Sequence, residues 1–114
     1  MDESRKQALR DAGVNVEEGL ERFMNNEALR ERFLPKFPAD PNPAALSAAL
    51  DKGDWAAALA AAHSLKGVCG NLSFTQLHQL LTRQVEALRA GDTDGALALR
   101  GPIEEGCARI TQLL

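Results

Sequence analysis

Hydrophobic residues recur along the chain at intervals of three and four, with glycine, proline or aspartate standing between successive runs. This is the period of an α-helix, and no stretch shows the alternation that marks a β-strand. About seven helical segments are therefore expected. The first two are predicted over about residues 3–11 and 15–24, with Asn15 and Glu18 forming a capping arrangement at the start of the second.

Prolines divide the part of the chain that follows. A third helical piece begins near Asn26, and Pro35 is expected to kink or break it, because proline lacks an N–H group and crowds the carbonyl four residues earlier. Residues 38–43 are expected to form a loop. Asn42 as the N-cap and Pro43 as the first helical residue then open the next helix.

Four longer helical segments make up the rest, over about residues 42–53, 55–72, 74–90 and 94–113. Asp54 is expected to cap the second of them, Ser73 with Gln76 to form a capping box for the third, and Gly101-Pro102 to kink the last. Short connections favour antiparallel neighbours. We therefore expect an all-α fold in a single domain, residues 1–114, with an antiparallel four-helix bundle over 42–114 and additional short N-terminal helices and a loop over 1–41 packed across it.

Composition and charge exclude several classes of function. The 114 residues are enough for one hydrophobic core, and the net charge of −3 comes with scattered basic residues, so no nucleic-acid surface is expected. No run reaches the roughly 18 apolar residues of a membrane span, and the N-terminus is charged, so we expect a cytoplasmic protein without a membrane partner. Cys69 and Cys107 lie at core spacing and are expected to be reduced and buried.

The stretch HSLKGVCG, residues 63–70, interrupts a run of strong helix formers. Helical geometry places His63 roughly 120° from the centre of the predicted core stripe, and therefore at the surface or at its edge. Gly67 and Gly70 each cost about 1 kcal/mol relative to alanine inside a helix, and we interpret them as leaving the imidazole approachable. Lys66, one turn further on, can place an ammonium near an anion attached to the ring. The predicted core stripe consists of Ala58, Ala62, Leu65, Cys69 and Leu72.

A surface imidazole beside a lysine, without acidic companions, suits a nucleophile that accepts and later releases a phosphoryl group. Two other interpretations stay open on the residues alone. His63 can be an ordinary surface residue, with the glycines serving helix packing, or the bundle can be a non-phosphorylated adaptor that binds partners. His78, Cys69 and Cys107 have no metal-ligand spacing, so no metal site is expected.

The residues His63, Leu65, Lys66, Gly67, Asn71, Leu72, Phe74 and Leu77 resemble the signature of the histidine-containing phosphotransfer (HPt) domain. The resemblance extends over nearly the whole chain. It implies that His63 is the phosphoryl acceptor, that Lys66 steadies the phosphoryl oxygens, and that Gly67 makes room for an incoming active site. It also implies a relay between phospho-aspartates in a two-component system, in which this chain is a phosphocarrier and not an enzyme.

The partners implied by the resemblance are a response-regulator receiver domain, a hybrid sensor histidine kinase, or both. The receiver would supply Mg²⁺, so no cofactor of the chain's own is expected, and we expect a monomer. The helical wheel places the residues of a docking face around His63: Ala56, Leu59, Ala60, Gly67 and Gly70.

Two positions depart from the family's pattern. Ser73 stands where the family commonly has glycine, which puts a left-handed helix end there in question. Val85 stands 22 residues after His63, where the family often has a Glu or Gln that hydrogen-bonds the imidazole. Gln84 and Glu86 flank Val85 but are rotated by about 100°, so we expect them to point elsewhere and the imidazole to be weakly oriented.

Overall fold

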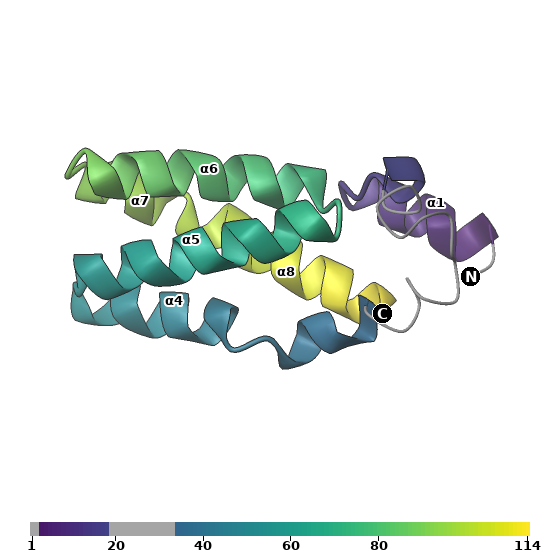
Figure 1. The fold of residues 1–114 in the computed structure, drawn as a ribbon, viewed down its shortest axis with the longest axis horizontal. Coiled ribbons are helices and arrows are strands. Elements are labelled where there is room, and N and C mark those ends of the chain that lie inside the picture. The colour runs from purple at the N-terminus through teal and green to yellow at the C-terminus, as the bar shows by residue number, and fades with distance from the viewer. Residues whose placement is uncertain (1–2, 19–33) are drawn as a thin grey trace.

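The computed structural model describes residues 3–18 and 34–114, and its regular elements over these ranges are helices (Figure 1). They are α1 (Glu3–Asp11), the 3₁₀ helix η1 (Leu34–Ala39), α4 (Asn42–Lys52), α5 (Trp55–Asn71), α6 (Thr75–Arg89), α7 (Thr93–Ala98) and α8 (Arg100–Leu113). The predicted all-α helical bundle is confirmed.

The molecule is elongated, with extents of 42 × 21 × 21 Å. Helix α5 lies between α4 and α6 and runs antiparallel to both (Figure 1). Helices α7 and α8 together form the fourth helix of the bundle (Figure 1). Leu65, Leu77, Leu81 and Ile110 are buried in the shared core. Burial of these aliphatic side chains is the main force that holds the helices together.

The last bundle helix is broken rather than kinked, and the break lies before the predicted Gly101-Pro102 step. Helix α7 ends at Ala98, Leu99 forms a turn, and α8 starts at Arg100. A continuous helix would bring the ring of Pro102 against the carbonyl of Ala98, four residues earlier. The chain therefore ends one helix at Ala98 and begins the next, whose first bond runs from Ile103 N to Leu99 O over 3.1 Å.

Helix α4 begins one residue earlier than predicted. Its N-cap is Pro41, which has no capping side chain, and Asn42 is already helical. Asp40 Oδ1 instead accepts the Asn42 N–H at 2.8 Å, so the carboxylate satisfies one of the free donors at this end. Because η1 extends to Ala39, the predicted loop over 38–43 is reduced to Asp40 and Pro41. The predicted end at Gly53 is confirmed, with φ of 66°.

The turn between α5 and α6 contains a serine in the left-handed region. Ser73 has φ of 60°, so the backbone that the family builds with glycine is kept here without it. The predicted capping box is wrong: the N-cap of α6 is Phe74, and the Ser73 hydroxyl donates to Glu18 Oε1 at 3.1 Å. This side-chain hydrogen bond helps to offset the cost of a left-handed non-glycine residue.

Residues 3–18 of the N-terminal segment attach to one end of the bundle. Arg5 Nε donates to the carbonyl of Leu113 at 3.0 Å, which satisfies a free acceptor in the last turn of α8. Asn15 N donates to Ser73 O at 2.8 Å, so the chain after α1 is tied to the α5–α6 turn. Helix α1 therefore lies beside the C-terminal end of α8 (Figure 1).

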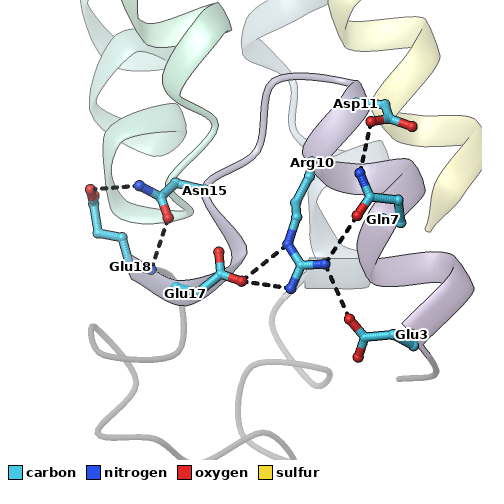
Figure 2. A network of polar contacts seen from close by, with 7 residues as sticks. All are labelled: Glu3, Gln7, Arg10, Asp11, Asn15, Glu17 and Glu18. Atoms are coloured by element: carbon cyan, nitrogen blue, oxygen red, sulfur yellow. Dashed lines mark hydrogen bonds and ion pairs between the residues drawn. The ribbon is translucent and has the colours of Figure 1, made fainter.

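Side chains also fix the way in which the chain leaves α1. The Arg10 guanidinium donates to Glu17 and Glu3, and joins α1 to the start of the next helix (Figure 2). The predicted capping by Asn15 is confirmed, because its Oδ1 accepts the Glu18 N–H at 3.0 Å. The rest of the helix predicted over 15–24, and the start of the piece predicted near Asn26, lie outside the described residues.

Candidate functional site

Helix α5 presents one face to the core and the opposite face to solvent. The Asp54 side chain caps it by accepting the Ala57 N–H at 3.2 Å, as predicted. All five residues of the predicted core stripe are buried: Ala58, Ala62, Leu65, Cys69 and Leu72. The helix is thereby held in a fixed rotation about its axis, which determines what its outer face displays.

His63 lies on the outer face, and its side chain is exposed. Lys66 follows one turn later and is half-buried. Within the described residues, neither side chain makes a hydrogen bond or an ion pair. The imidazole and the ammonium are therefore both free to bind an added anionic group on this face.

The two glycines of the motif have different surroundings. A Cβ atom built at Gly67 would meet nothing within 4 Å, so this position is open. A Cβ at Gly70 would come within 3.2 Å of His78 Cδ2 on α6. Gly67 therefore leaves space outside the helix beyond His63, whereas Gly70 leaves space for a side chain of the neighbouring helix.

The other residues of the predicted docking face have mostly short side chains. Ala56 and Ala60 are exposed on the same stripe as His63 and Gly67. Leu59 is half-buried and packs against the core. A surface of small side chains with one apolar edge can be approached closely by the face of another protein.

No side chain of α6 supports the imidazole from the position that the family uses. Val85 is buried, with 1% of its surface exposed. Gln84 points into the bundle interior, where its Nε2 donates to Ala96 O at 3.1 Å, and Glu86 is exposed. The expectation that these two flanking residues point away from His63 is therefore confirmed for Gln84, and the described residues give Glu86 no contact with the imidazole.

The described ranges 3–18 and 34–114 contain no group of three or more His, Cys, Asp or Glu residues that could hold a metal ion. Burial raises the pKa of the Cys69 thiol far above its usual range and that of Cys107 to about 11. Both thiols are free, Cys69 is buried as predicted, and Cys107 is only half-buried. Neither thiol is therefore ionised at neutral pH, which argues against a cysteine nucleophile in the described residues.

A protein-family model, described as the Hpt domain, matches residues 28–114 of the chain. The chain belongs to the Hpt family. Hpt domains are helical phosphocarrier modules that transfer phosphoryl groups through histidine in two-component phosphorelays. Comparisons with curated proteins and with solved structures gave no match. In the described part of this Hpt domain, no helix is long and apolar enough to span a membrane.

Sequence reasoning missed two residues that organise the side of the Hpt domain formed by α4, α6 and α8. Arg100 of α8 forms an ion pair of 2.7 Å with Asp51 of α4 and one of 3.0 Å with Glu104. Gln84 is fully buried beside them. The spacing of Arg100 and Glu104 by four residues was the available signal for the first. For Gln84, nothing in the sequence indicated that it is the one of the three glutamines of α6 that is buried.

Proposed function

We propose that this chain relays phosphoryl groups to and from receiver-domain aspartates, with His63 as the acceptor. The observation that carries the proposal is the exposed imidazole on a helix whose opposite face is fully packed. Membership of the Hpt family supports the same chemistry. Lys66, one turn away and without an ion-pair partner among the described residues, is proposed to hold the phosphoryl oxygens.

In the proposed step, an unprotonated imidazole nitrogen of His63 attacks the phosphorus of a phospho-aspartate. A nitrogen–phosphorus bond forms as the bond between phosphorus and the carboxylate oxygen breaks, and the aspartate leaves as a carboxylate. The second ring nitrogen keeps its proton, so the product is a phospho-imidazole whose added negative charge faces the Lys66 ammonium. The reverse reaction returns the group to another aspartate, and the chain is a carrier and not an enzyme.

The proposed partner is a response-regulator receiver domain, alone or within a hybrid sensor kinase. Its acidic pocket would bring Mg²⁺, whereas the described residues of this chain contain no group of three or more His, Cys, Asp or Glu that could hold a metal ion. The proposed docking face consists of Ala56, Leu59, Ala60 and Gly67 around His63, with Gly70 at its edge. We further propose that the protein acts in the cytoplasm. We also propose that it acts as a monomer, because one exposed histidine is sufficient for the transfer.

The chain has two histidines, and this makes a matched control available. The experiment mixes a ³²P-labelled receiver domain and Mg²⁺ with the wild-type chain, His63→Gln or His78→Gln. Label is expected to pass to the wild type and to His78→Gln, with the stability in alkali and lability in acid of phosphohistidine. No label is expected on His63→Gln.

A helical adaptor that is never phosphorylated gives the opposite results. The receiver would keep its label in all three mixtures while still binding the chain. Label that persists on His63→Gln would also contradict the proposal, because another residue would then be the acceptor. Circular dichroism of each variant establishes that the helical fold is intact.

A further inference from the structure

A cavity of about 150 Å³ lies between α4, α6 and α8 and is partly open to solvent. Its apolar wall is formed by Pro43, Leu46 and Leu50 of α4 and Ile103 and Cys107 of α8. No residue of α5 lines it, so it is separate from the face that carries His63. An apolar cavity of about this volume is large enough for one six-membered aromatic ring.

The charged residues at this cavity already bind one another. Arg100 Nη2 donates to Ser47 Oγ at 2.8 Å, and Ser47 Oγ donates to Glu104 Oε1 at 3.1 Å. Arg100 also pairs with Asp51 at 2.7 Å. Burial raises the pKa of the Cys107 thiol to about 11, so this wall residue is uncharged at neutral pH. A charged ligand would have to break these pairs, and an uncharged one would not.

Gln84 supplies the polar group of the cavity that has no partner. Its side chain is fully buried and lines the cavity, and its Nε2 donates to Ala96 O at 3.1 Å. Because a carbonyl can only accept, this bond fixes which end of the amide faces α7. Gln84 Oε1 is left as a buried acceptor without a hydrogen bond in the described part of the chain. An unsatisfied buried acceptor is costly, so a donor brought to it would bind favourably.

We infer that this cavity binds a small uncharged aromatic molecule of the phenol class, whose ring contacts the apolar wall and whose single O–H donates to Gln84 Oε1. The volume sets the size of the ring, the apolar wall excludes strongly hydrated groups, and the orphan acceptor selects a donor. A cluster of waters fits less well, because each water needs two to four polar partners and the other polar groups are already paired.

Phenol and toluene are the probes, because they have nearly the same shape and differ in the donor. Each is titrated into the chain, and the methyl resonances of Leu46, Leu50 and Ile103 are followed by NMR. Phenol is expected to give saturable shifts of these methyl groups and to bind about three- to tenfold more tightly than toluene, the effect of one neutral hydrogen bond. The inference is overturned if phenol gives no saturable shift, or if toluene binds as tightly.

Three variants locate the site. Gln84→Met removes the acceptor at similar volume and is expected to abolish the preference for phenol. Cys107→Phe fills the cavity and is expected to abolish binding of both probes, whereas Ala108→Phe, the same change at the exposed neighbouring position, should leave binding intact. Binding that survives Cys107→Phe would overturn the assignment. Since the wild-type comparison needs no substitution, the test holds even if a variant fails to fold.

Discussion

Gly70 of α5 lies against the imidazole of His78 on α6, so closely that a Cβ atom at residue 70 would come within 3.2 Å of His78 Cδ2. Gly67, three residues earlier, has nothing within 4 Å of the corresponding position. The two glycines of one motif thus meet different constraints. Gly70 allows the two helices to pack at this point. Gly67 has no side chain, which leaves open space on the outer face of α5 beside His63.

Alanine substitutions should separate these constraints by their effect on stability. Gly67→Ala is expected to raise the free energy of unfolding by about 0.5–1 kcal/mol, because alanine favours the helix and meets no neighbour. Gly70→Ala brings the same helix preference but displaces His78, so its gain should be smaller or negative. Urea denaturation measures both, and an equal gain at the two positions would contradict the packing described here.

A larger side chain at residue 67 should impair transfer while the fold remains stable. Gly67→Leu projects a side chain into the open space beyond His63, and is expected to slow phosphoryl transfer from a receiver at least about tenfold, the effect of roughly 1.4 kcal/mol on the barrier. Gly101→Leu is the control, since Gly101 is also open but lies on α8. Transfer rates would be measured with labelled receiver. Equal rates for both variants would argue against docking at this face.

At residue 73, a glycine variant should be more stable than an alanine variant, which is the reverse of the usual order. At ordinary helical positions alanine is more stable than glycine by about 1 kcal/mol. Ser73 has φ of 60°, where a side chain is strained, so Ser73→Gly should be more stable than Ser73→Ala by about 1 kcal/mol. Both variants lose the hydrogen bond to Glu18, which therefore cancels in the comparison. Thermal unfolding measures the two variants. A higher unfolding temperature for Ser73→Ala than for Ser73→Gly would show that residue 73 is not in the left-handed region.

The helical bundle could be predicted from the spacing of hydrophobic residues, because the buried positions recur regularly along each helix. Ala58, Leu65 and Cys69 could be assigned to the core, and His63 to the surface, from spacing alone. The same argument could not foresee contacts between helices, since a wheel describes one helix by itself. The contact of Gly70 with His78 and the ion pair of Arg100 with Asp51 depend on how two helices pack.

Local rules for helix ends were less successful where tertiary contacts compete for the same groups. Asp54 and Gly53 behave as their sequence pattern predicts, because no side chain of the described residues competes for their hydrogen-bonding groups. Ser73 does not cap α6, because its hydroxyl binds Glu18 from the N-terminal segment. A partner 55 residues away in the sequence, as Glu18 is, gives no local signal.

The ion pair of Asp51 with Arg100 should make part of the stability dependent on pH. The hydrogen bond from Arg100 holds the pKa of the Asp51 carboxyl below its usual value of 3.8. The folded state therefore favours the ionised form, and this contribution is present above about pH 3.8 and is lost as the pH falls below that value. Comparing unfolding of the wild type and Asp51→Asn across this range should show their difference narrowing towards acid.

The control for that experiment is Asp94→Asn, since Asp94 is exposed and has no ion pair among the described residues. Its unfolding curve should differ from that of the wild type by an amount that changes less with pH than the difference for Asp51→Asn. A pH-independent difference for Asp51→Asn would mean that the pair with Arg100 does not form in solution.

The most direct test of the central claim is to locate the phosphoryl group on the chain. After transfer from a receiver domain under mildly alkaline conditions, NMR of the imidazole nitrogens can identify which ring bears phosphorus. The account predicts that phosphorus is bonded to a nitrogen of His63 and that the His78 resonances are unaffected by bonding. Phosphorus on His78, or an unmodified His63 in the presence of an active donor, would contradict it.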